Sequence, residues 1–111
     1  MENIDKETKK KISKLQMLEQ RLQSLAMQKQ TFQTQSMESD NALREIDNSE
    51  DTYKVVGNVM ISEKKNELKK ELTSKKEMAD MKVTNLEKEE KKLREEATEL
   101  QKEVMGSIKN E

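Results

Sequence analysis

Before residue 47, apolar residues recur at alternating intervals of three and four, the spacing of a heptad seam in a coiled coil. Polar residues fill the gaps in this rhythm, and the same alternation resumes at residue 69. The pattern therefore predicts two long helices, each with one seam face. The seam positions of the first helix are Leu15, Leu18, Leu22, Leu25, Lys29, Phe32, Ser36, Ser39, Leu43 and Ile46. Those of the second are Lys69, Leu72, Lys76, Ala79, Val83, Leu86, Glu90, Leu93, Ala97, Leu100 and Val104.

The two seams are mirror images about the point between Gly57 and Asn58. Residue 46 corresponds to 69, residue 25 to 90 and residue 15 to 100, and each pair of numbers adds up to 115. Only a chain that folds back at this point brings the two seams into register, so the sequence predicts an antiparallel helical hairpin. Lys29 and Glu90 lie one layer apart in the seams, and we expect them to pair and fix the register.

A short apolar segment rich in valine occupies the fold-back point, with the sequence TYKVVGNVMIS from Thr52 to Ser62. Valine, isoleucine and tyrosine favour strands, and a glycine at the first turn position supplies the positive φ of a type II′ turn. We therefore predict a β-hairpin in which Val56 faces Val59 and Val55 faces Met60, with Gly57 and Asn58 forming the turn.

These elements divide the chain into three segments. We expect a first coiled-coil helix over residues 1–48, a β-hairpin segment over 49–62 and a second coiled-coil helix over 63–111. Asp47–Ser49 is the expected exit from the first helix, and Ser62 is the expected N-cap of the second. The predicted fold class is mainly α: a long antiparallel coiled-coil hairpin with a central β-hairpin that joins an oligomeric β-barrel platform.

The need for a platform follows from the weakness of an isolated hairpin. A two-stranded hairpin is marginal in water, and this one has two unpaired edges and apolar residues on both faces. We expect hairpins of other chains to cover it in a shared sheet or barrel. The alternative is an ordinary helix-to-helix loop with incidental valines. The expected oligomerisation residues are Tyr53, Val55, Val56, Val59, Met60 and Ile61.

Composition narrows the function. The chain is 41% charged, with a net charge of −1, and contains no cysteine, histidine or proline. Balanced charge removes the electrostatic case for nucleic acid or an anionic membrane as a partner. Without a phosphate-binding glycine loop, a thiolate or a nucleophile beside a base, we expect no enzyme, no cofactor and no metal. The chain has no apolar signal region at its start and no membrane-length apolar run, so we expect a soluble, cytoplasmic protein.

The segment YKVVGNVMI is preceded by QKQ at Gln28–Gln30 and ALREI at Ala42–Ile46, and is followed by a long charged helix. In these features the chain resembles the β-type subunits of the prefoldin family, most closely the archaeal ones. The resemblance implies a hexamer of two α-type and four β-type subunits whose hairpins form a double β-barrel platform. It also implies capture of unfolded polypeptides without nucleotide and their delivery to a group II chaperonin.

The ends of the helices remote from the hairpin are the expected client-binding region. Outward from the layer of Leu15 and Leu100 the seam loses its apolar pairing, yet apolar residues persist nearby. Flexible methionines suit weak binding of many sequences, and the resemblance also implies client contact here. The alternative is that these residues merely cap the coil or are singly exposed. The predicted client-binding residues are Ile4, Ile12, Leu15, Met17, Val104, Met105 and Ile108.

Two functions therefore remain. The chain is either a holdase subunit that assembles through its hairpin and binds clients at its distal ends, or a coiled-coil spacer or tether that docks one defined partner. A tether should present a specific docking pattern at its ends, and the sequence shows none.

Overall fold

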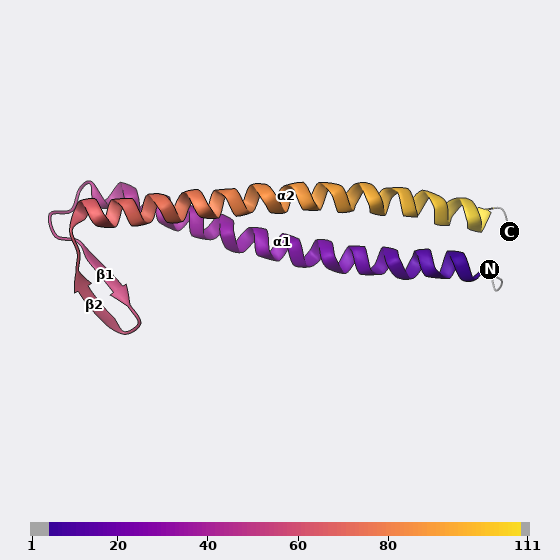
Figure 1. The fold of residues 1–111 in the computed structure, drawn as a ribbon, viewed down its shortest axis with the longest axis horizontal. Helices are drawn as coiled ribbons and strands as arrows, with labels where there is room; N and C mark the ends of the chain where they lie inside the picture. Colours follow the sequence, from indigo (N-terminus) through magenta and orange to yellow (C-terminus); the bar gives the residue numbers. More distant parts are fainter. Residues whose placement is uncertain (1–4, 110–111) are drawn as a thin grey trace. The chain divides into compact units, whose positions relative to one another are not determined.

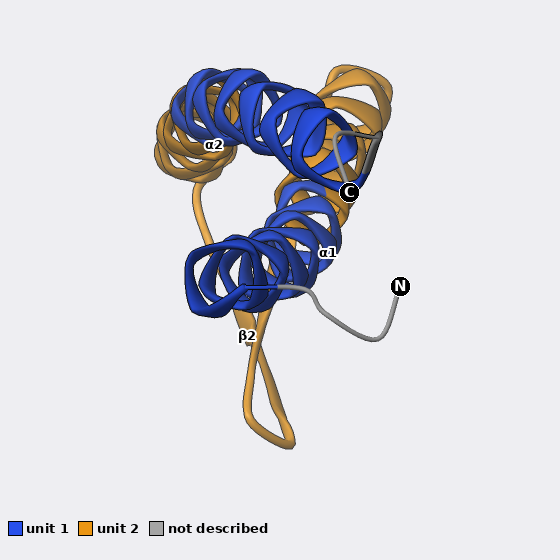
Figure 2. Ribbon diagram, turned by 90° about the vertical axis from the view of Figure 1, so that its right-hand side faces the viewer, with its two compact units in different colours: residues 1–29, 85–111 blue, residues 30–84 orange. Residues whose placement is uncertain are grey.

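The computed structural model describes residues 5–109, in which two long helices flank two short strands. Helix α1 spans Lys6–Ile46, strand β1 Tyr53–Val56, strand β2 Val59–Ser62 and helix α2 Lys65–Lys109 (Figure 1). The chain divides into two compact units, unit 1 with residues 1–29 and 85–111 and unit 2 with residues 30–84 (Figure 2). Each unit therefore contains one segment of α1 and one segment of α2.

In unit 1 the predicted seam residues are the ones removed from solvent. Leu18 is buried and Leu25 is completely buried, whereas Leu22, Leu86 and Leu93 are half-buried. The residues between them on α1, such as Gln23, are exposed. A 3.5-residue repeat keeps one face of each helix against the other, so the apolar positions share a dry seam. The seam prediction is confirmed here.

Ion pairs along the edges of the unit 1 seam follow the antiparallel order. Lys11 lies 3.3 Å from Glu103 and Arg21 lies 3.0 Å from Glu89, so rising numbers on α1 meet falling numbers on α2. Pairs this exposed add little stability, about 0–1 kcal/mol each. Their contribution is to the direction and register of the pairing.

The predicted pair of Lys29 and Glu90 is confirmed. The Nζ atom of Lys29 lies 2.8 Å from Oε1 of Glu90, a side chain that is only 3% exposed. A guanidinium nitrogen of Arg94 lies 3.6 Å from the other carboxylate oxygen. A carboxylate this deeply buried is costly without a cation, so the pair selects the register in which both groups meet.

In unit 2 the seam has buried positions and also side-chain contacts that involve Ser36 and Phe32. Ile46, Ala79 and Ser39 are buried. The Ser36 hydroxyl donates a hydrogen bond of 2.5 Å to a carboxylate oxygen of Asp80, which lowers the pKa of Asp80. The ammonium of Lys82 lies over the ring of Phe32, 4.7 Å from its centroid, in a cation–π contact. The seam therefore continues through its less apolar layers.

Helix α1 ends at Ile46, directly before the expected exit at Asp47–Ser49. The Ser49 hydroxyl donates to the carbonyl of Glu45 at 3.1 Å, and the Lys65 ammonium donates to the carbonyls of Asp47 and Ser49 at 3.3 and 3.2 Å. Both contacts satisfy carbonyls at the end of the helix, where partners within the helix run out. The cation also complements the negative end of the helix dipole.

The expected N-cap at Ser62 is wrong. Ser62 is the last residue of β2 and pairs with Tyr53, so its backbone is extended and belongs to the strand ladder. The first turn of α2 forms two residues later, where the amide of Leu68 donates to the carbonyl of Lys64 at 3.0 Å. Strand pairing therefore outweighs a local capping preference at this boundary.

Replacing Leu25 by alanine tests the seam. The change leaves a cavity at the only side chain among the described residues that is large and completely buried, and we expect it to lower the free energy of unfolding by about 2–5 kcal/mol. Thermal unfolding followed by circular dichroism measures this loss. The control Gln23→Ala removes an exposed side chain from the same helix and should change stability by less than about 0.5 kcal/mol.

Replacing Lys29 and Glu90 separately and together tests the register pair. We expect Lys29→Leu alone to destabilise the chain by about 3 kcal/mol, because the Glu90 carboxylate stays buried without its closest cation. The double variant Lys29→Leu with Glu90→Leu should recover that loss, since a leucine pair matches the adjoining seam layers. Chemical denaturation of the single and double variants measures both values. A double variant less stable than Lys29→Leu would contradict this account.

Candidate functional site

The β-hairpin has the predicted register. Tyr53 pairs with Ser62, Lys54 with Ile61, Val55 with Met60 and Val56 with Val59. Gly57 has a φ of 62°, and no other described residue has a positive φ. A positive φ at the first turn position alone fits type II′ and excludes type I′, which needs it at both positions. The mirror symmetry of the seams thus has its centre at this turn.

Both faces of the hairpin are apolar and open to solvent. Its six large apolar side chains are 48–67% exposed. They are the predicted oligomerisation residues Tyr53, Val55, Val56, Val59, Met60 and Ile61. Within the two-stranded sheet each strand also has one edge that pairs with nothing. Exposed apolar side chains with free strand edges are the features by which a hairpin recruits further strands.

Polar contacts at the base of the hairpin hold it to α2. The Thr52 hydroxyl donates to the carbonyl of Glu63 at 2.5 Å, and the amide of Glu63 donates to the carbonyl of Thr52 at 3.0 Å. The ammonium of Lys54 lies 3.0 Å from a carboxylate oxygen of Glu71. The pair of Lys54 and Glu71 connects β1 to the first turns of α2, whereas the bonds between Thr52 and Glu63 extend the strand ladder below Tyr53 and Ser62. The sequence analysis missed the pairing of Lys54 with Glu71, because it depends on the direction in which the hairpin leaves the helix.

Charge at this base is shared among three side chains. The hydrogen bond to Glu71 raises the pKa of Lys54. A hydrogen bond between the carboxyl groups of Glu63 and Glu71 raises the pKa of Glu63. The hydrogen bond to Glu63, which has the larger effect, and the hydrogen bond to Lys54 both lower the pKa of Glu71. Glu71 therefore remains the anion that holds Lys54, while Glu63 is the carboxyl group that more readily keeps its proton.

The predicted client-binding residues separate into two groups in unit 1. Leu15 and Ile12 on α1 and Ile108 on α2 are half-buried, and Val104 is 8% exposed, so these four pack toward the seam. Met17 and Met105 are 69% and 56% exposed and point away from it. Ile4 lies outside the described residues. The exposed methionines are thus the members most open to another molecule.

Close to this end of α1, Asp5 caps the helix. One of its carboxylate oxygens accepts a hydrogen bond of 2.7 Å from the amide of Thr8, and this bond lowers the pKa of Asp5. Thr8 itself is buried. The first turn of α1 is therefore held by a side chain rather than by the seam alone.

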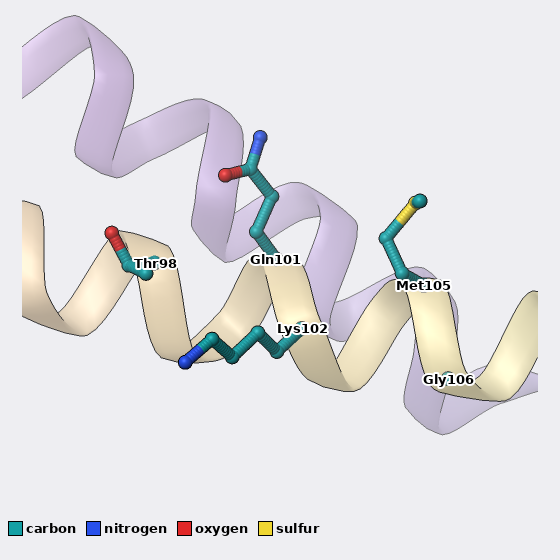
Figure 3. Close-up of a pocket in the computed structure, with 5 residues that line it drawn as sticks. All are labelled: Thr98, Gln101, Lys102, Met105 and Gly106. Carbon is teal, nitrogen blue, oxygen red and sulfur yellow. The ribbon is translucent and has the colours of Figure 1, made fainter.

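A shallow pocket lies on α2 beside Met105 (Figure 3). It has a volume of about 610 Å³ and is lined by Thr98, Gln101, Lys102, Met105 and Gly106. Gln101 and Met105 extend to the same side of the helix in Figure 3. A β-carbon at Gly106 would meet nothing within 4 Å, so the glycine leaves this surface open rather than filled. The spacing of three and four residues along α2 is the sequence signal for this surface.

Metal-holding groups and membrane spans were looked for among residues 5–109. That part of the chain contains no group of three or more histidine, cysteine, aspartate or glutamate residues placed to hold a metal ion. Nor does it contain a helix long and apolar enough to cross a membrane. The hairpin and the distal helix ends are the candidate functional surfaces because of their exposed apolar side chains.

Comparison with known proteins identifies the family. A family model described as "Prefoldin subunit" matches residues 9–111. The prefoldin subunit beta of Archaeoglobus fulgidus is 34% identical over 100 residues, which are 87% of this chain and 86% of the relative. The prefoldin subunit beta of Methanospirillum hungatei is 32% identical over 111 residues, 97% of this chain and 92% of the relative.

A solved structure agrees with these relatives. The crystal structure of the prefoldin beta subunit from Thermococcus strain KS-1 matches with a TM-score of 0.86 and 31% sequence identity, and 96% of each chain is covered. Its match extends across both helices and the hairpin, the elements from which the candidate surfaces are built. The chain therefore belongs to the prefoldin family of chaperone subunits, and the relatives that it matches over most of its length are β subunits.

Proposed function

We propose that this chain is a β-type subunit of a holdase that works without ATP. In this proposal four copies join two α-type prefoldin subunits through a platform of β-hairpins. The complex binds unfolded polypeptides at the distal helix ends in the cytoplasm and delivers them to a group II chaperonin. No cofactor takes part, and neither nucleic acid nor a membrane is a partner.

The observation that carries the proposal is the exposure of apolar side chains on both faces of the hairpin. Within residues 5–109 of a single chain, no element covers Val55 on one face and Ile61 on the other, which are 66% and 48% exposed. Burying apolar surface stabilises a complex by about 25 cal/mol per Å². Strands from other subunits, added at the two open edges, satisfy the unpaired backbone groups, and closure of the shared sheet into a barrel buries its inner face.

Client binding is supported by the chemistry of the distal ends. Met17 and Met105 are exposed in unit 1, and the pocket at Met105 combines an apolar side chain with the amide of Gln101 and the cation of Lys102. A thioether adapts to many shapes, whereas a specific docking site needs fixed polar partners. With four such chains in one complex, several weak contacts bind one client together, and the overall affinity exceeds that of each contact.

The first test is capture of an aggregating client. The chain is assembled with an α-type subunit, a chemically denatured protein is diluted into it without nucleotide, and light scattering follows aggregation. We expect suppression near a one-to-one ratio of complex to client. Matched double variants locate the contact: Met17→Ser with Met105→Ser should weaken capture about fivefold or more, which corresponds to about 1 kcal/mol of lost contact.

The matched control is Met37→Ser with Met78→Ser. These methionines are 59% and 52% exposed, one on each helix, but they belong to unit 2. We expect the control to capture clients as well as the original chain does. Equal losses in both double variants would place the contact along the whole helices, and unsuppressed aggregation by an assembled complex would favour the tether.

A second test addresses the hairpin. Val55→Lys with Ile61→Lys places one charge on each face, and we expect monomers or dimers by native mass spectrometry, because a buried unpaired cation opposes assembly. Helical content by circular dichroism should not change, since neither residue is in a helix. Ser74→Lys adds charge to an exposed position of α2 and should leave the hexamer intact. A hexamer in the hairpin variant would remove the platform from the proposal.

A further inference from the structure

A second pocket lies in unit 2, where the hairpin meets the two helices. Its volume is about 410 Å³, within the range of roughly 300–1,000 Å³ typical of ligand pockets. We call it the root pocket. Its apolar lining comes from α1, β1 and α2, and consists of Ala42, Ile46, Tyr53, Val55, Leu68 and Leu72.

The root pocket is continuous with one face of the hairpin. Tyr53 and Val55 are two residues apart on β1, so their side chains lie on the same face, and both line the pocket. The helix residues in the pocket are more covered, with Ile46 buried and Leu68 and Leu72 half-buried. An apolar surface thus runs from a recessed floor on the helices to an exposed wall on the strand.

The wall of the pocket already contacts α2 within a single chain. The ion pair between Lys54 and Glu71 connects β1 to α2 directly beside it, and the two hydrogen bonds between Thr52 and Glu63 close the base of the hairpin. A preformed pocket loses little conformational entropy when it is filled. The root pocket is therefore suited to receive a rigid apolar element.

We propose that the root pocket receives aliphatic side chains from the hairpin of a second copy of this chain. The proposal deepens the assembly proposed above and rests on it. Within unit 2 the hairpin points away from the helices (Figures 1 and 2), so its end does not fill its own pocket. Val56, Val59 and Ile61 lie on the face opposite Tyr53 and Val55 and are exposed there.

Charge complementarity favours this occupant. Glu45, Asp51 and Lys54 also line the root pocket, so its charged lining has one more carboxylate than cations and disfavours an anionic segment. Residues 53–62 contain no carboxylate, and their only charged side chain is the cation of Lys54. The hairpin of a second copy thus brings three aliphatic side chains and no negative charge to the pocket.

The contact has a consequence for the assembly. The hairpin end and the root pocket are different surfaces of one chain, so each copy both inserts into a neighbour and receives from another. Such a heterologous contact continues in one direction until a ring closes or a subunit without a matching surface ends the series.

Disulfide trapping tests the proposal, because the chain has no cysteine of its own. Protein with Ala42→Cys is mixed with protein carrying Val56→Cys, Val59→Cys or Ile61→Cys, assembled with the α-type subunit and oxidised mildly. We expect at least one mixture to form a dimer linked between the two variants about tenfold more than a control mixture with Thr34→Cys, since a disulfide needs Cα atoms within about 7 Å. Peptide mass spectrometry identifies the link.

A filling variant gives an independent readout. Ala42→Phe occupies the pocket, and we expect it to reduce the assembled fraction in native mass spectrometry at least tenfold while helicity is retained. An assembled complex with no link to residue 42 in any mixture would overturn the root pocket contact and leave holdase activity untouched. A chain that stays monomeric with and without the α-type subunit would refute both this contact and the platform. Links to residue 42 without client capture would support the contact and refute only the holdase.

Discussion

The antiparallel seam between α1 and α2 is the interaction on which the rest of the structure depends. Neither helix has an apolar face wide enough to be stable alone, and the charged residues outside the seam remain in water. Leu18 and Leu25 exclude water in unit 1, while Ile46 and Ala79 do so in unit 2. Because the seam is so narrow, its register depends on a few groups, of which the buried carboxylate of Glu90 is the most demanding.

The seam leaves apolar side chains uncovered at the hairpin, at the distal helix ends and at methionines along the helices, such as Met37 and Met78. At the hairpin the chain turns through Gly57, and although Lys54 of β1 pairs with Glu71 of α2, the six large apolar side chains of the strands stay exposed. Towards the distal ends, Met17 on α1 and Met105 on α2 are exposed beside the seam. A chain with this little core therefore presents its remaining apolar side chains to other molecules, which is consistent with a family of chaperone subunits.

The sequence was sufficient to predict the features governed by a strict period. The heptad spacing identified buried positions such as Ile46. The mirror relation predicted the pairing of the helices and the strand register, in which Tyr53 pairs with Ser62. It was not sufficient where a side chain had two roles. Ser62 is a good cap in isolation and a strand residue in context. The root pocket and the pair of Lys54 and Glu71 depend on the angle between hairpin and helix, which no local pattern encodes.

The mirror register also implies an order in which the paired layers of the seam form. The strand partners lie a few residues apart in sequence, whereas Ser36 and Asp80 are separated by 44 residues, Lys29 and Glu90 by 61, and Arg21 and Glu89 by 68. If the seam layers form in order, starting at the turn, each new layer closes only a short loop, and the entropy cost of each step is small. The layers farthest from the turn close last and reopen first, at the lowest free energy. We therefore expect the two helices to separate most readily at the ends where unfolded chains are expected to bind.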